Sequence, residues 1–213
     1  MSYTGFRFGT QIEPLWNIYF LALLIELGPA IEADRIPLGD RRVFSYRFKI
    51  DPDAVEIFRS DYGWSDFIKR SEELAAQNDW IVMCDISDFY ARLSHHPLEN
   101  ALKHLRDDRN YGRKIMRLLS SYTHNRSHGA PVGGPAARLL SELTLNQIDR
   151  LLRQGRVNFL RFADDYHIFV KAKRKAIAHL CFYLISFIGA GLSAAEGKDT
   201  TYALERVPCS YAS

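Results

Sequence analysis

The sequence predicts an α+β domain in which an antiparallel or mixed sheet is backed by helices on one face. Three patterns support this fold class. Residues 80–85 form an apolar run that ends in a carboxylate, which is typical of a central strand buried on both faces. Residues 157–170 read as strand, tight turn and strand. Residues 136–152 repeat leucine and isoleucine at helical spacing.

The other elements follow in chain order from the same periodicities. We expect a helix over residues 14–27, then a loop rich in glycine and proline, and a strand over residues 42–50. Further helices are expected over residues 64–78, 97–105, 112–122 and 175–188, and a last extended segment over residues 200–204. The composition is even along the chain, without a repeat or a low-complexity linker.

Length and composition indicate a globular protein, because 213 residues with 47% hydrophobic content can bury a sizeable core. The net charge of +3 permits contact with nucleic acid without requiring it. Three widely spaced cysteines predict neither a disulfide framework nor a zinc site, which fits a reducing cytoplasm. The apolar stretch over residues 15–31 contains Asn17 and Glu26 and lacks signal-peptide features, so we expect a buried helix there rather than a membrane span.

Three aspartates carry the strongest chemical signal. Asp85 ends the predicted central strand, and Asp164 and Asp165 stand at the apex of the predicted hairpin. These places can lie side by side in an antiparallel sheet. Converging carboxylates bind Mg²⁺, and two ions about 4 Å apart can activate a hydroxyl and stabilise a leaving pyrophosphate. A solvated Asp-Asp turn is the plainer interpretation, but an uncompensated Asp85 after an apolar run would be costly.

These residues resemble the motifs of reverse transcriptases. Residues 85–90 resemble motif A, residues 129–149 motif B and residues 162–165 motif C, in the family's order. Residues 191–198 resemble motif D, and residues 44–48 resemble a fingers segment. The resemblance covers most of the chain and implies an RNA-directed DNA polymerase, which is a nucleotidyltransferase.

The resemblance also implies an architecture. Residues 1–80 would form a fingers-like region that is partly helical and partly β. Residues 81–213 would form the polymerase palm, a ferredoxin-like antiparallel sheet backed by helices. The helical thumb of complete members is expected to be missing from the chain or to be supplied by another chain.

Within the motifs, the resemblance implies a set of metal ligands. Asp85, Asp164 and Asp165, together with the backbone carbonyl of Ile86, would hold two Mg²⁺ ions, for which Mn²⁺ can substitute. Lys198 in motif D would be the general acid that protonates the leaving pyrophosphate, with a solvated turn lysine as the alternative. The histidines show no metal-ligand spacing and receive no role.

The resemblance further implies contacts to the incoming nucleotide. Tyr90, next to Phe89, matches the bulky position that blocks a ribose 2′-OH, so that dNTPs would be preferred over NTPs. A core aromatic is the alternative role for Tyr90. Arg47, or Arg41 or Arg42 in its place, could hold the triphosphate because guanidinium groups grip phosphate oxygens. A solvated strand edge is equally compatible with these arginines.

The loop of motif B adds another nucleotide contact. Gly133 and Gly134 would let the backbone pass close to a base or sugar, although a plain loop before a helix has the same composition. Pro131 and Val132 precede them, and Val132 stands where retroviral and intron enzymes carry Gln. The exchange removes a polar contact near the nucleotide, which leaves the mode of templating open.

The sequence from Pro131 to Gly133, followed by the pattern R-L-L-x-E over residues 138–142, is similar to abortive-infection and defence-associated bacterial reverse transcriptases. This subgroup implies a cytoplasmic protein of antiviral defence against phage. Its partners would be an RNA template or a structured non-coding RNA, dNTPs, the DNA product and a further chain that supplies a thumb or an effector, with no membrane. Two alternatives stay open. They are template-independent or protein-primed DNA synthesis, and a non-catalytic RNA-binding or assembly subunit that keeps the palm fold.

Overall fold

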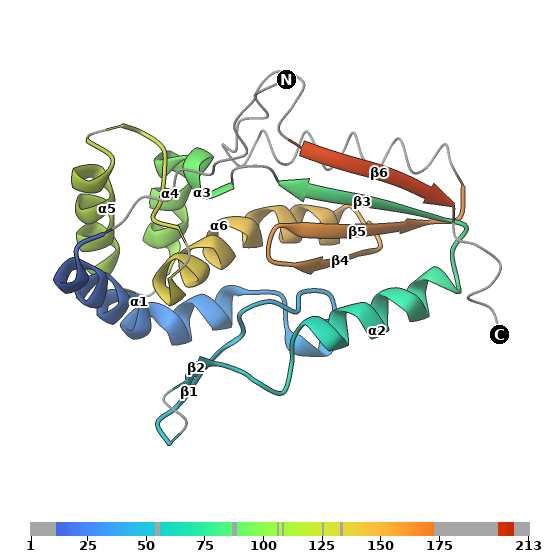
Figure 1. Ribbon diagram of the computed structural model, residues 1–213, viewed down its shortest axis with the longest axis horizontal. Coiled ribbons are helices and arrows are strands. Elements are labelled where there is room, and N and C mark those ends of the chain that lie inside the picture. Colours follow the sequence, from blue (N-terminus) through green and yellow to red (C-terminus); the bar gives the residue numbers. More distant parts are fainter. Residues whose placement is uncertain are drawn as a thin grey trace.

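A four-stranded antiparallel sheet forms the centre of the molecule (Figure 1). The computed structural model describes residues 12–53, 56–86, 89–105, 107, 109–124, 126–132 and 134–172, and the backbone of residues 200–206. The strand order is β4 (Phe159–Phe162), β5 (Asp165–Val170), β3 (Trp80–Ile86) and β6 (Thr200–Arg206). Every neighbouring pair is antiparallel. The predicted α+β class, the central strand and the hairpin are therefore confirmed.

The two faces of the sheet are covered by different helices. On β3, Val82, Cys84 and Ile86 are buried, and the residues between them are only partly buried. The Cys84 face belongs to the main core, which includes the buried side of α6 (Pro135–Gln154). Ile81 and Phe169 lie on the other face and pack with α2 (Trp64–Ala75). The expectation of helices on one face was wrong, because the apolar residues on the second face require α2 as a partial cover.

The first helix is longer than its sequence pattern predicts. α1 spans Pro14–Asp34 and continues through Gly28 and Pro29, although proline removes a backbone donor inside a helix. Packing compensates for this cost, since the buried stripe from Phe20 to Ile31 lies against α6 and the other core residues. Of the helices in the described ranges, α1 alone is long and apolar enough to cross a membrane by length and composition. Core helices pass the same test.

The predicted strand over residues 42–50 is broken into pieces. Val43 forms an isolated parallel bridge with Arg161, and the regular strand β1 (Phe48–Asp51) begins five residues later and pairs with β2 (Glu56–Phe58). Tyr46, between the two, has a φ of 44°, which no strand residue adopts. The short 3-10 helix η1 (Leu38–Asp40) precedes this segment. Figure 1 shows the β1–β2 hairpin projecting away from the body of the molecule.

The remaining helices lie close to their predicted positions. They are α4 (His95–His104), α5 (Tyr111–Tyr122) and α6, and Figure 1 shows α4 and α5 beyond one end of the sheet. The short helix α3 (Phe89–Arg92) was not predicted. The predicted helix over residues 64–78 ends earlier, at Ala75. The predicted helix over residues 175–188 and the motif D segment lie outside the described residues.

The close approach of α1 to β1 gives a test of the packing. Gly28→Ala should lower the free energy of unfolding by about 1–3 kcal/mol, the usual cost of overpacking a core. The reason is that an added Cβ would lie 2.2 Å from Cζ of Phe48. Urea denaturation measures the change, and adding Phe48→Leu should restore part of the loss. Gly39→Ala is the matched control because nothing lies within 4 Å of a Cβ there. An unchanged stability of Gly28→Ala would contradict this packing.

Candidate active site

The hairpin between β4 and β5 carries two of the three predicted aspartates. Phe162 pairs with Asp165, so Ala163 and Asp164 form a two-residue turn. Ala163 has a φ of 53°, a left-handed conformation that costs an alanine about 1–2 kcal/mol. Nη1 of Arg161 donates a hydrogen bond of 2.9 Å to the carbonyl oxygen of Ala163. The charged side chain of Arg161 thus stabilises the turn that carries Asp164.

The register of the sheet brings the third aspartate to this hairpin. Cys84 on β3 pairs with Tyr166 on β5, and one further step of the same register sets Asp85 beside Asp165. The electrostatics agree with this placement. Partial burial, followed by the charges of Asp164 and Asp85, raises the pKa of Asp165 to about 6. Asp165 therefore lies close enough to the other two carboxylates for their charges to act on it.

A divalent cation matches the chemistry of these three carboxylates, because it would relieve their mutual repulsion and needs oxygen ligands. Within the described ranges, however, no group of three or more His, Cys, Asp or Glu side chains is arranged to hold a metal ion. Ile86, whose carbonyl was the fourth expected ligand, is the last residue of β3 and has a buried side chain. The expectation that these residues bind a metal ion thus rests on their carboxylate oxygens and on the backbone positions of the aspartates.

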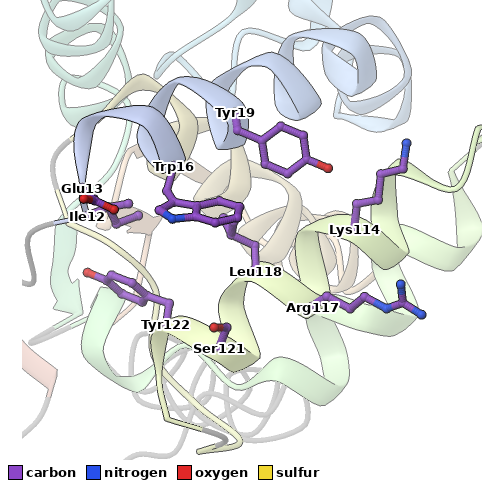
Figure 2. Close-up of a pocket in the computed structure, with 9 residues that line it drawn as sticks. All are labelled: Ile12, Glu13, Trp16, Tyr19, Lys114, Arg117, Leu118, Ser121 and Tyr122. Atoms are coloured by element: carbon purple, nitrogen blue, oxygen red, sulfur yellow. The ribbon is translucent and has the colours of Figure 1, made fainter.

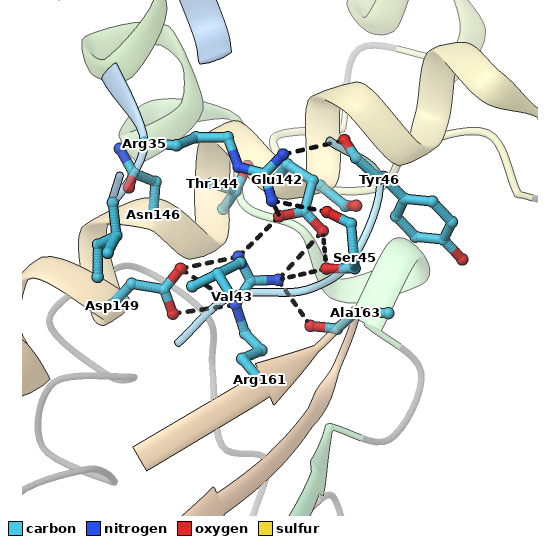
Figure 3. Close-up of polar contacts among 12 residues, drawn as sticks. Arg35, Val43, Ser45, Tyr46, Glu142, Thr144, Asn146, Asp149, Arg161 and Ala163 are labelled. Atoms are coloured by element: carbon cyan, nitrogen blue, oxygen red, sulfur yellow. Dashed lines mark hydrogen bonds and ion pairs between the residues drawn. The ribbon is translucent and has the colours of Figure 1, made fainter. Parts of the chain in front are cut away.

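Directly beneath the hairpin lies a fully buried network of ion pairs centred on Arg161 (Figure 3). Its Nη2 lies 2.7 Å from Oε2 of Glu142 and 2.7 Å from Oδ2 of Asp149, both on α6. Nε adds a bond of 2.9 Å to Oδ1 of Asp149, which also accepts a bond of 3.0 Å from the Tyr166 hydroxyl. Burial alone would raise the pKa of Glu142, but Arg161 and Arg35 outweigh it and hold that pKa below its usual value.

Arg35, which follows α1, extends the same network to the segment before β1. Its Nη2 donates to Oε2 of Glu142 at 2.5 Å and to the Ser45 carbonyl at 2.7 Å. Its Nη1 donates to the Tyr46 carbonyl at 2.9 Å. The Ser45 hydroxyl adds a hydrogen bond to the network by donating to Oε1 of Glu142 at 2.5 Å. One helix carboxylate, Glu142, therefore ties the segment before β1 to the hairpin.

Arg47, predicted to hold a triphosphate, is instead a core residue. Its side chain is 1% exposed, and Nε, Nη1 and Nη2 donate to the Val43 carbonyl, the Glu32 carboxylate and the Ile36 carbonyl. Burial lowers the pKa of Arg47, and the neighbouring cation of Arg35 adds to the shift. The predicted triphosphate contact was wrong, because the segment expected to be an exposed strand edge turns the Arg47 side chain into the protein interior.

The alternative arginines are also engaged in contacts within the protein. Arg42 donates a bond of 2.9 Å to the Val157 carbonyl and lies 5.4 Å from the centre of the Phe159 ring. Arg41 lies on the surface with its Nη1 3.8 Å from Glu73. Neither contact involves the three aspartates.

Tyr90 lies in the first turn of α3, next to the buried Phe89. Burial raises the pKa of the Tyr90 hydroxyl to about 12, with opposition from a hydrogen bond to Ser141 on α6 and further raising by Tyr46 and Asp164. The ring is partly buried and packs against the main core. Its position is compatible both with a contact to the sugar of a nucleotide and with the core role.

The loop of motif B is tied to the segment after motif A. The Gly129 and Ala130 amides donate to the Leu93 and Tyr90 carbonyls at 2.8 Å each, and Nε2 of His95 donates to the Gly129 carbonyl at 2.7 Å. These bonds give His95 a structural role.

The end of this loop leads into α6. Pro131 is buried, whereas Val132 is 47% exposed. A Cβ on Gly134 would meet only Asn17, at 3.8 Å, so the protein interior does not require glycine there. Gly133 and Lys198 lie outside the described residues.

Sequence reasoning missed Tyr46 and Arg138 as candidates. Cζ of Arg138, in the first turn of α6, lies 5.0 Å from the centre of the Tyr46 ring, and that ring lies 6.1 Å from the Phe162 ring. Burial raises the pKa of Tyr46, with Arg138 opposing and Glu142 and Asp164 adding to the shift. Tyr46 is therefore near Asp164 in a left-handed backbone conformation, and such strain often marks functional sites. Periodicity could not reveal it, because the segment reads as an ordinary strand.

Comparison with known families agrees with the geometry of the hairpin and the sheet. A family model described as reverse transcriptase (RNA-dependent DNA polymerase) matches residues 41–206, a range that holds all three aspartates. Among curated proteins, none matches the sequence.

The buried network predicts a large effect of removing its central cation. Arg161→Met should lower the free energy of unfolding by about 3–5 kcal/mol, because Glu142 and Asp149 would then be buried carboxylates short of their main counter-charge. Equilibrium urea denaturation measures this change. Lys103→Ala, which breaks an exposed ion pair with Glu99, should cost only about 0.3–0.5 kcal/mol. Equal losses in the two variants would argue against the network.

Proposed function

Because the chain belongs to the reverse transcriptase family, we propose that it copies RNA into DNA at the cluster of Asp85, Asp164 and Asp165. The family's activity is RNA-directed DNA polymerisation, a nucleotidyl transfer. The observation that carries the proposal is the sheet register, which sets Asp85 beside Asp165 while the Arg161-bound turn presents Asp164. In support of the proposal, the register brings together the backbone of two segments that resemble motifs A and C and lie almost eighty residues apart in the chain.

The chemistry proposed for this cluster is a two-metal phosphoryl transfer. Asp85, Asp164 and Asp165, with the Ile86 carbonyl, would hold divalent cations, Mg²⁺ or Mn²⁺ in its place. When bound, these ions supply activation of the attacking 3′-hydroxyl and stabilisation of the leaving pyrophosphate. The raised pKa of Asp165 supports this assignment, since a cation offsets the like charges that cause part of it. Lys198 is kept as the proposed general acid.

Arg138 is the arginine that we assign to the triphosphate in place of Arg47. It lies in the first turn of α6, where the helix dipole also favours an anion. The Tyr46 ring beneath it, near Asp164, gives the guanidinium a fixed platform. Tyr90 and the neighbouring Phe89 would contact the sugar, and the loop from Pro131 to Gly134 would face the base.

The biological setting that we propose is cytoplasmic antiviral defence in bacteria. It rests on the similarity of the motif B loop and the following R-L-L-x-E pattern to defence-associated reverse transcriptases. The partners would be an RNA template or a structured non-coding RNA, dNTPs and the DNA product, with a further chain as an effector.

Template-independent or protein-primed synthesis is the second candidate, and Val132 favours it. This side chain is 47% exposed at the position where templated enzymes carry Gln, so the loop offers an apolar contact instead of a polar one. Primer extension on homopolymer RNA templates with single dNTPs separates the two activities. Templated synthesis follows the complementary base, whereas untemplated synthesis keeps one base preference on every template.

The assignment of the aspartates predicts a loss of catalysis without unfolding. Asp164→Asn should reduce dNTP incorporation by at least about a thousandfold, as expected when one metal ligand loses its charge. The midpoint of urea denaturation should change no more than it does for an ordinary surface substitution. Incorporation of a labelled dNTP with Mg²⁺, and with EDTA as the metal-free comparison, measures the effect. The non-catalytic alternative predicts no incorporation by the unmodified protein in the first place. Full activity of Asp164→Asn would refute the assigned site.

Tyr90 predicts a separate change in sugar selectivity. Tyr90→Val should raise the incorporation of NTPs relative to dNTPs by about tenfold or more, because the ring would no longer meet a ribose 2′-OH. The ratio of the kcat/KM values for a dNTP and its matching NTP measures the change. Tyr62→Val is a control, since Tyr62 stacks on Phe44, 4.8 Å away, in the separate cluster beside α2. An unchanged ratio in Tyr90→Val would leave Tyr90 with its core role alone.

A further inference from the structure

A pocket of about 540 Å³ lies outside the cluster of aspartates, between the start of α1 and α5 (Figure 2). Trp16 and Tyr19 reach into it from α1, and Lys114, Arg117 and Leu118 line it from α5. Trp16 and Tyr19 form an edge-to-face pair with ring centres 6.1 Å apart. Their exposed fractions of 54% and 41% are high for aromatic residues, which normally pack inside.

The pocket combines these aromatic rings with positive charge. Lys114 and Arg117 are exposed on α5, and Figure 2 shows both on the side of the pocket to which Tyr19 points. Nζ of Lys114 also lies 5.1 Å from the centre of the Tyr111 ring, which fixes one cation near the rim. Among the described residues that line the pocket, Glu13 is the one acidic side chain, so this part of the lining is positive on balance. Exposed rings beside cations match the stacked bases and the phosphates of an unpaired strand.

The position of the pocket relates it to the proposed polymerase site. A smaller pocket is lined by Asn17 and Phe20 of α1 and by Pro131, Val132 and Gly134 of the motif B loop. Ile12 lines both pockets, so they adjoin at the beginning of α1. A strand that contacts the motif B loop could therefore extend into the larger pocket.

We propose that the pocket between α1 and α5 binds single-stranded nucleic acid, with bases on Trp16 and Tyr19 and phosphates on Lys114 and Arg117. The proposal rests on the proposed polymerase function, whose motif B loop it adjoins. A lipid surface fits less well, because the site is a hollow with cations inside its lining rather than a convex apolar face. A protein partner would have to match the same cations with acidic groups.

The test measures binding and does not need turnover. Fluorescence anisotropy with labelled oligo(dT) and oligo(U), across a salt series, gives the affinity and its salt dependence. Trp16→Ala should weaken binding by about 5- to 150-fold, the usual effect of losing one stacked base. Lys114→Ala with Arg117→Ala should reduce the slope of log K against log salt by about 1.4, because each contact to a single-strand phosphate contributes about 0.7. All of these side chains are exposed, so the variants are expected to fold.

Two controls on the same chain make the result specific. Leu15→Ala changes a side chain of α1 that is 77% exposed and does not line the pocket, and Lys69→Ala removes an exposed cation from α2. Both should bind like the unmodified protein. Unchanged affinity and salt slope in the pocket variants would overturn the proposal, as would equal losses in the controls, which would indicate a general apolar or charged surface. If the pocket variants lose binding while the unmodified protein incorporates no dNTP, the polymerase function fails and the binding site stands.

Discussion

The burial of one arginine in the sheet constrains the rest of the structure. Arg161 is fully buried on β4, and an isolated guanidinium there would cost several kcal/mol. Two carboxylates of α6, Glu142 and Asp149, compensate for its charge. The Ala163 carbonyl accepts a further hydrogen bond from Arg161, and the Tyr166 hydroxyl donates one to Asp149. Because all of these groups must be in place at once, α6, the sheet and the turn are fixed relative to one another.

Two strained residues border this network, one on each side. Ala163 in the hairpin and Tyr46 before β1 both have positive φ, and an arginine donates a hydrogen bond to the carbonyl of each. Such conformations persist only where the surroundings determine them strongly. Glu142 joins Arg161 to Arg35, so the two strained segments depend on the same carboxylate. The conformation of the turn that carries Asp164 and the positions of Tyr46 and Arg138 therefore depend on one another.

Periodicity and turn chemistry predicted the hairpin, the central strand, the long helix of motif B and the pairing of Asp85 with the hairpin. Each of these depends on local pattern and on sheet geometry. Arg47 and the strand over residues 42–50 were not predicted correctly, because basic residues in an alternating segment look exposed and only the tertiary structure shows Arg47 bound by Glu32. The ion-pair network could not be predicted from the sequence. Its members Arg35, Glu142 and Arg161 are far apart in the chain, and each resembles a surface charge. The exposure of Trp16 was also missed, because the apolar stretch that carries it predicts a buried helix.

Glu142 couples the segment of residues 42–48 to the hairpin. Hydrogen–deuterium exchange of the Glu142→Gln variant, read by peptide mass spectrometry, tests this coupling. Exchange in residues 42–48 and in residues 159–170 should increase together, by similar factors, under conditions in which the protein stays folded. Faster exchange confined to α6, with both of these segments unchanged, would contradict it.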